Sequence, residues 1–208
     1  MKLFDLPIMS KPMVVDVHPE WCPGYPEQPD IGKWKMWDGQ SSEVEVIEFL
    51  YALVRLVKPK LIVETGPLLG YSTVAMVAAQ HENGFGKMIT IEITPGLVEE
   101  TKRTIEESGL SSDNVEVITG SSLDELPKIV GPIDLLFSDS HIPIRGDEIE
   151  ICLPKMSPLG IIAVHDTSPN HLYARQYLNK KLEENVIDRI HFPCPRGLSL
   201  AKIKIGAL

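Results

Sequence analysis

Between residues 61 and 165, short apolar runs alternate with stretches that have the period of an amphipathic helix. The runs Leu61-Ile62-Val63 and Ile161-Ile162-Ala163-Val164 carry no polar side chain, so both faces of these strands must be covered. Parallel strands with helices packed on both sides of the sheet meet this requirement. The alternation predicts a doubly wound α/β domain with a mostly parallel sheet.

The expected elements follow from this period. Strands are expected at 61–64, 88–92, 115–118, 133–139 and 161–165, with helices at 72–81, 97–108, 123–129 and 147–156. A further helix is expected at 41–57, capped by Ser41 or Ser42 and ended by Pro59. After a helix at about 172–184, the β-like runs 187–192 and 198–205 are close enough to form a hairpin, which predicts an antiparallel final strand.

Residues 1–40 differ from the rest because they are rich in proline and tryptophan. We expect an irregular arm at 1–40 and one domain at 41–208. Trp34 and Trp37 suit the wall of a pocket for a planar or apolar acceptor. The alternative is ordinary packing against the sheet edge or against a second subunit. A homodimer is therefore one of the expected assemblies.

Composition narrows the class of partner. The formal net charge of −9 opposes a broad phosphate-binding face, so nucleic acid is not expected and a small-molecule substrate is. Cys22, Cys152 and Cys194 lack paired spacing, which favours free thiols in the cytoplasm. The first 15 residues do not resemble an export signal, and no apolar run approaches the roughly 20 residues of a membrane span.

The turn after the first strand is the first candidate ligand site. Gly66 and Gly70 permit a tight turn and a close approach of backbone to ligand. A dinucleotide site would need a third glycine where Leu68 stands, and Glu64 would repel phosphate. The alternative is that the glycines only turn the chain and that Glu64 is solvated.

An acid at that strand end suits a cationic ligand, and S-adenosylmethionine carries both an ammonium group and a sulfonium. The hydroxyls of Ser72 and Thr73, with the helix N-terminus, are suited to hold its carboxylate. Glu92 ends the next strand, about 20 residues beyond the turn, where an acid can bind ribose hydroxyls; its alternative role is to cap the helix at Thr94. Ser122 can bond an adenine edge or cap a helix.

With these residues in place, the chain resembles class I S-adenosylmethionine-dependent O-methyltransferases over about residues 40–205, in particular the small catechol O-methyltransferase-like group. In that family the string E-x-G-x-x-x-G-Y-S binds the methionine moiety, and it stands here as Glu64, Gly66, Gly70, Tyr71 and Ser72. The resemblance implies a seven-stranded sheet with a reversed last strand. It also implies further contacts to the cofactor through Glu92, Ile93, Ser122 and Asp139.

Two acids that end neighbouring strands point to a metal. Asp139 and Asp166 are expected to converge, and carboxylates suit a hard cation such as Mg²⁺. By the resemblance these positions are ligands in metal-dependent family members, whose usual third ligand, an Asn, is replaced here by Thr167. His165 is the other candidate, although its nitrogen is softer than Mg²⁺ prefers. Whether a metal assists is left open.

Methyl transfer to oxygen needs a group that weakens or removes the acceptor's proton. His141, two residues beyond Asp139, is the expected general base, because an imidazole accepts a proton near neutrality. Arg145 is a poor base and is expected to bind an anionic part of the substrate or to lie on the surface.

The sequence favours methylation of a hydroxyl on a small molecule. N-methylation and a catalytically silent subunit that binds a nucleoside remain alternatives, since the fold and cofactor site do not fix the acceptor.

Overall fold

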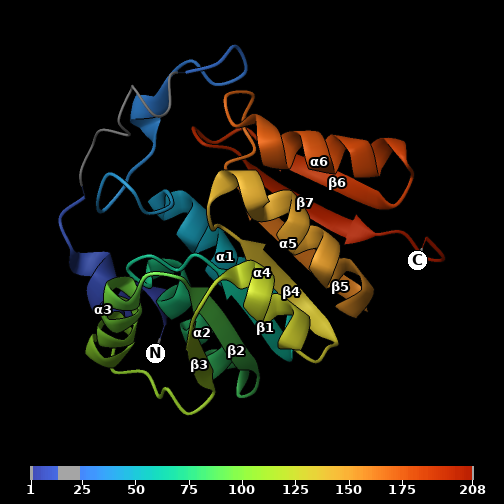
Figure 1. The fold of residues 1–208 in the computed structure, drawn as a ribbon. Helices are drawn as coiled ribbons and strands as arrows, with labels where there is room; N and C mark the ends of the chain where they lie inside the picture. Colours follow the sequence, from blue (N-terminus) through green and yellow to red (C-terminus); the bar gives the residue numbers. More distant parts are fainter. Residues whose placement is uncertain (1, 14–23, 208) are drawn as a thin grey trace.

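The computed structural model describes residues 2–13 and 24–207, and these form a seven-stranded sheet in the order β3-β2-β1-β4-β5-β7-β6 (Figure 1). The strands are β1 (Leu61–Thr65), β2 (Lys87–Glu92), β3 (Val115–Thr119), β4 (Ile133–Ser138), β5 (Met156–His165), β6 (Ile187–Phe192) and β7 (Leu198–Ile203). The first five run parallel, whereas β7 is antiparallel to both β5 and β6. The doubly wound fold and its reversed last strand are confirmed.

Helices cover both faces of this sheet. The α-helices are α1 (Val44–Val57), α2 (Tyr71–Asn83), α3 (Pro95–Glu107), α4 (Ser122–Glu125), α5 (Arg145–Cys152) and α6 (Leu172–Glu183). Short 3-10 helices are η1 (Leu3–Asp5), η2 (Pro7–Ser10), η3 (Ile31–Lys33), η4 (Leu126–Lys128), η5 (Ile142–Ile144) and η6 (Leu153–Lys155). No helix in the described ranges is long and apolar enough to cross a membrane.

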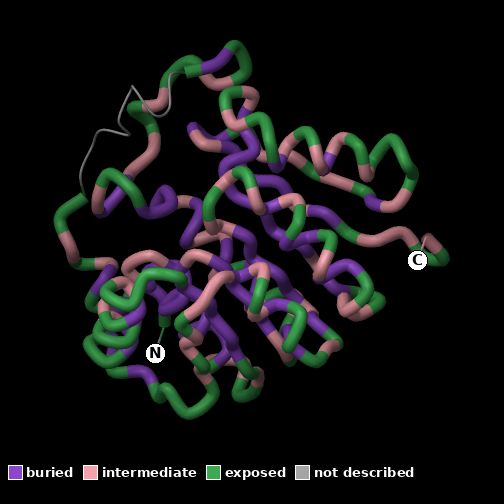
Figure 2. Tube along the Cα trace, viewed as in Figure 1, coloured by how far each residue is buried: buried purple, intermediate pink, exposed green. Residues whose placement is uncertain are grey.

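The two faces of the sheet have separate hydrophobic cores, as the alternation of side chains along a strand requires. Ile62 packs with residues of α1 and α2, whereas its neighbour Val63 packs with residues of α5 and α6. Both side chains are fully buried. In Figure 2 the central strands are accordingly buried and the outer surfaces of the helices exposed.

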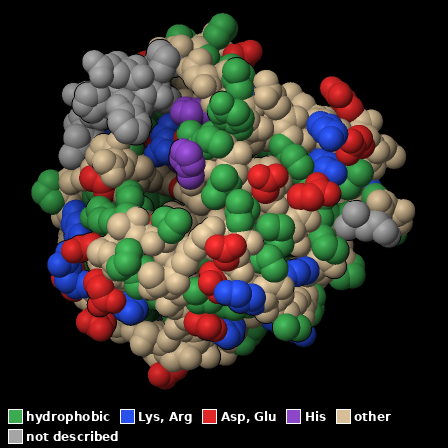
Figure 3. All heavy atoms as spheres, in the orientation of Figure 1, with side chains coloured by type: hydrophobic (Ala, Val, Ile, Leu, Met, Phe, Trp, Pro, Cys, Tyr) green, Lys and Arg blue, Asp and Glu red, His purple; other side chains and the backbone are tan. Residues whose placement is uncertain are grey.

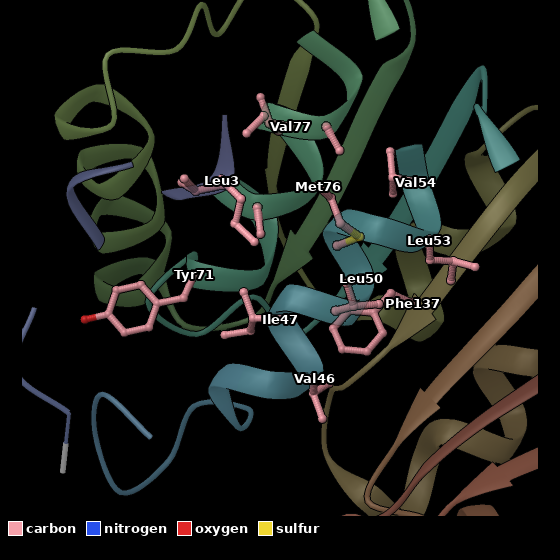
Figure 4. Close-up of a cluster of buried hydrophobic side chains, with 14 of the residues drawn as sticks. Leu3, Val46, Ile47, Leu50, Leu53, Val54, Tyr71, Met76, Val77 and Phe137 are labelled. Atoms are coloured by element: carbon pink, nitrogen blue, oxygen red, sulfur yellow. The ribbon is translucent and has the colours of Figure 1, made fainter. Parts of the chain in front are cut away.

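The first of these cores joins α1 to the sheet (Figure 4). Leu50 of α1 and Phe137 of β4 are completely buried within it. Leu3 belongs to the same cluster, together with Leu6 and Ile8. The beginning of the arm therefore packs by aliphatic side chains in short 3-10 helices.

One helix start differs from the sequence-based expectation. Helix α1 begins at Val44, because Ser41 and Ser42 use their hydroxyls to bind Asp38 and Asp139 and do not cap the helix. Helix α6 begins at Leu172, as expected, after a turn in which Ser168 bonds the His171 ring. These contacts bring polar side chains to the carboxyl ends of the strands.

Candidate active site

A cavity of about 670 Å³ lies at the carboxyl ends of the parallel strands, where open α/β sheets bind ligands. It is lined from the strand ends by Gly66, Glu92, Ser122, Asp139 and Asp166. Figure 3 shows histidine side chains at the edge of a hollow on this face, next to a Lys or Arg side chain. The topology thus brings most of the expected site residues together in one cavity.

The turn after β1 is built for close backbone contact. Gly66 and Gly70 have φ values of +74° and +82°, a region that side chains disfavour. A Cβ at Gly66 would lie 2.6 Å from the carbonyl oxygen of Asp139. The glycine therefore holds the end of β1 against the end of β4, and Gly70 precedes the free N-terminus of α2.

Glu64 lies behind the cavity wall. Its carboxylate is fully buried and accepts hydrogen bonds from Ser72 (2.6 Å), Thr73 (2.5 Å) and Thr90 (2.8 Å). Burial raises the pKa of Glu64, and these three hydroxyls offset part of that rise. Glu64 thus orients Ser72, which lines the cavity. The carboxylate of Glu64 is occupied by the hydroxyls of Ser72 and Thr73, which were expected to bind the ligand, and by that of Thr90.

The wall beside β2 and β3 combines acid, hydroxyl and apolar groups. Glu92 lines the cavity, and one of its oxygens accepts the Thr94 amide at 2.8 Å, so both roles expected of it are compatible. Ile93 also lines the cavity. Ser122 lines it too but donates its hydroxyl to the buried carboxylate of Glu148, which Ser138 binds as well.

The three groups expected near a metal converge as predicted. Ligand atoms of Asp139, His165 and Asp166 all lie within 4.8 Å of one another. Thr167 does not join them, because its hydroxyl lies 2.9 Å from Ser199 Oγ, towards β7. The hydroxyl of Thr167 is thus engaged with Ser199, and its expected role as a third ligand stays a prediction.

Arg145 occupies the space between the two aspartates. Its Nη2 lies 3.0 Å from Asp139 Oδ1 and 2.8 Å from Asp166 Oδ2, and its side chain is only 3% exposed. Of the two positions expected for Arg145, the surface position is wrong, whereas contact with a substrate stays a prediction, because Arg145 lines the cavity. The first residue of α5 points inward and pairs with acids at the ends of β4 and β5.

Arg196 completes the pairing of Asp166. It donates two hydrogen bonds to that carboxylate, from Nε (2.6 Å) and Nη2 (2.9 Å). Burial alone raises the pKa of Asp166, but the charges of Arg196 and Arg145 hold it well below its ordinary value. Asp166 is thus a charged carboxylate, and both of its oxygens are paired with arginine side chains.

His165 is buried between two acids. Its Nδ1 lies 3.1 Å from Asp139 Oδ1, and its Nε2 lies 2.7 Å from Glu43 Oε2. Burial alone lowers the pKa of His165, but the charges of the nearby carboxylates outweigh burial and raise it to about 10. At neutral pH both ring nitrogens therefore carry protons.

Two histidines line the cavity itself. His141 is exposed at its rim, immediately before η5, in the region expected for a base. His171 was not anticipated; its Nδ1 lies 2.9 Å from Ser168 Oγ and its Nε2 lies 3.9 Å from Asp166 Oδ1. Burial lowers the pKa of His171, so its imidazole is neutral at pH 7.

The tryptophans do not wall the cavity, among the described residues. Trp37 is buried and packs edge-on against Tyr71, with ring centroids 5.5 Å apart. Trp34 is partly buried against the same core. The arm lines the cavity instead through Met36, Gly39 and Gln40. Of the two expectations for these residues, ordinary packing is the one observed.

Comparison with known proteins supports the class that the fold and the site define. A family model described as "Methyltransferase domain" matches residues 63–167, about half of the chain. The chain belongs to this family of methyltransferase domains.

Curated relatives are more specific. A catechol O-methyltransferase from Niastella koreensis is 35% identical over 123 residues, which cover 57% of this chain and 54% of the relative. One from Mycobacterium tuberculosis is 33% identical over 94 residues, covering 45% of this chain and 41% of the relative. The chain thus spans about half the length of these relatives or less.

Solved structures show the same fold. A Bacillus cereus O-methyltransferase in complex with SAH matches with a TM-score of 0.70 at 22% identity, over 80% of this chain and 84% of that one. The SAH-bound Podospora anserina methyltransferase matches with a TM-score of 0.72 at 19% identity, over 94% and 91%. At these identities the likeness establishes the fold.

Proposed function

We propose that the protein transfers a methyl group from S-adenosylmethionine to a hydroxyl of a small molecule. The observation that best supports this proposal is the cavity at the strand ends. Its lining includes Gly66, Ser72, Glu92 and Ser122. The relatives named O-methyltransferases support the reaction. The family model for a methyltransferase domain matches residues 63–167, which include these strand ends.

The groups of the cavity suit this cofactor. The carboxylate of Glu92 can accept hydrogen bonds from the two ribose hydroxyls. Beside it, Ile93 and Leu97 form an apolar wall that suits the adenine ring. The free backbone amides at the start of α2, next to Ser72, suit a carboxylate. Tyr71 closes the cavity beside them. When bound, the cofactor supplies an electrophilic methyl group.

The chain's own part in the reaction is to position the acceptor and to take its proton. His141 at the cavity rim is the proposed base, and His171 deeper in the cavity is a second candidate, because its imidazole is neutral at pH 7. Asp139, which lines the cavity, is proposed as a second catalytic residue that contacts the acceptor. Its Oδ2 accepts a hydrogen bond from Ser42 at 2.8 Å, which fixes its orientation.

We further propose a cytoplasmic protein that acts without nucleic acid or membrane, alone or as a homodimer. Cys152 and Cys194 are buried free thiols, and burial raises the pKa of Cys152 to about 12, which keeps it unreactive. Cys22 lies outside the described residues.

The direct test is methyl transfer. The purified chain is incubated with S-adenosylmethionine and a panel of phenols, alcohols and amines, and products are detected by mass spectrometry. Gain of one methyl group on an oxygen supports the proposal. Transfer only to nitrogen would assign the chain to N-methylation, and cofactor binding with no transfer would favour a silent nucleoside-binding subunit.

A further inference from the structure

Asp139 and Asp166 lie close enough to share a cation, but the guanidinium of Arg145 already lies between their carboxylates. A single nitrogen, Arg145 Nη2, lies within 3.0 Å of an oxygen of each carboxylate. An ion bridging the two acids would have to displace this nitrogen. The residues present therefore do not fit a divalent metal.

The remaining carboxylate oxygens are also engaged. Asp166 is clamped by Arg196 at 2.6 and 2.9 Å, one donor to each oxygen. Asp139 Oδ2 accepts the Ser42 hydroxyl at 2.8 Å. A cation with six or more oxygen ligands would find few lone pairs here that are not already used.

Arg145 is fixed by the backbone and cannot simply move aside. Its Nε donates to the carbonyl oxygen of Ser140 at 2.8 Å, and its Nη1 donates to the carbonyl of His165. Ser140 follows β4 and His165 ends β5, so the guanidinium joins the ends of two neighbouring strands. Its side chain is only 3% exposed.

The positive charges of the two arginines also oppose the binding of a divalent cation. Guanidinium groups stay protonated at any physiological pH, so Arg145 and Arg196 neutralise two negative charges permanently. A divalent cation placed between the aspartates would lie in contact with the Arg145 charge and be repelled by it.

We propose that Arg145 takes the structural place of a divalent ion in this protein, cross-linking Asp139 and Asp166 at the floor of the cavity, so that the site works without metal. A consequence, which rests on the proposed function, concerns the acceptor. With no ion to chelate, the acceptor needs only one hydroxyl, and two adjacent oxygens give no advantage.

The first test uses the full chain without cofactor or substrate. Mn²⁺, which is detected directly by electron paramagnetic resonance, is titrated into the native protein and Asp166→Asn. We expect no site with a dissociation constant below about 1 mM, the weak end of protein affinities for hard cations. A single tighter site that Asp166→Asn abolishes would overturn the proposal.

The second test removes the guanidinium. Arg145→Met leaves both aspartates without this cation and is expected to bind Mn²⁺ at least about tenfold more tightly than the native chain. Arg103→Met, whose side chain is 61% exposed on α3, is the control and should change nothing. A folded Arg145→Met variant without this gain contradicts the role given to Arg145; if it does not fold, the native titration decides.

These outcomes are separable from the proposed function, because no Mn²⁺ measurement requires methyl transfer. Once an acceptor is found, activity should be unchanged by chelators and equal for one-hydroxyl and vicinal-diol analogues within a few-fold. A metal requirement together with a strict preference for adjacent hydroxyls would overturn the inference while leaving the methyltransferase assignment in place.

Discussion

Nε2 of His165 lies 2.7 Å from Oε2 of Glu43, although 122 residues separate the two along the chain. Both side chains are completely buried. Glu43 immediately precedes α1, and its other oxygen accepts the backbone amide of Arg196 at 3.0 Å. One buried carboxylate thus ties the start of the first helix, the end of β5 and the loop before β7 together beneath the cavity.

This pair predicts a specific pH dependence of stability. The pKa of His165 is about 10 in the folded chain and 6.5 ordinarily, so the folded state keeps a proton that the unfolded state releases. Its contribution is complete below pH 6.5 and is lost as pH rises towards 10, with a slope of at most about 1.4 kcal/mol per pH unit. Urea unfolding between pH 6 and 10 measures this loss. His165→Gln should show a flatter profile, and an unchanged slope in the variant would contradict the assignment.

Removal of Arg196 should be costly. Arg196→Met leaves Asp166, which is completely buried, without its bidentate partner. Breaking a buried pair from one side costs about 3–5 kcal/mol, so we expect a loss of that size in the free energy of unfolding. Chemical denaturation is the measurement, with the exposed Arg103→Met as control. A loss below about 1 kcal/mol, typical of a surface pair, would show that Asp166 is not held as described.

The glycine turn can be tested against a matched glycine. Gly66→Ala and Gly84→Ala both place a side chain at positive φ, +74° and +80°, at a backbone cost of about 1–2 kcal/mol. Only at Gly66 would the new Cβ meet backbone, 2.6 Å from Asp139 O, whereas nothing lies within 4 Å at Gly84. Gly66→Ala should therefore lose cofactor binding in calorimetry, and Gly84→Ala should keep it. Equal affinities would remove the turn from the site.

The two cavity histidines can be separated by kinetics. If His141 takes the acceptor's proton, His141→Asn lowers kcat by about 10²–10⁴-fold and leaves cofactor affinity unchanged. The same result in His171→Asn alone would move the role to His171. Retained kcat in both variants would leave no general base among the histidines that line the cavity.

The fold was predictable because it depends on local patterns. Apolar runs such as Ile161 to Val164 predict strands that are covered on both faces. Because the carboxyl ends of parallel strands meet at one edge of the sheet, the polar residues at those ends are expected to line one cavity. Glu92 and Gly66, which this reasoning singled out, both line the cavity.

The charged floor of the cavity was not predictable in the same way. Arg145, Glu43 and Arg196 meet Asp166 and His165 only through tertiary contacts across long separations, and no local period marks an inward-facing arginine at the start of a helix. The signal available was chemical: two acids expected to converge need compensating charge, and Arg145 and Arg196 stand close to the strand ends in sequence. His171 was not singled out from the sequence; it lies in the turn immediately before α6, where Ser168 bonds its ring.

The central claim, a cofactor site at the carboxyl ends of the strands, is tested most directly by calorimetric titration of S-adenosylmethionine into the native chain, Glu92→Ala and Glu99→Ala. Glu99 lies on α3 with a side chain that is 73% exposed, so its variant is the matched control. The account predicts saturable one-site binding that Glu92→Ala weakens by at least about tenfold, the loss of a charge-assisted hydrogen bond, and that Glu99→Ala leaves intact. Absence of binding to the native chain, or equal binding by all three proteins, would contradict it.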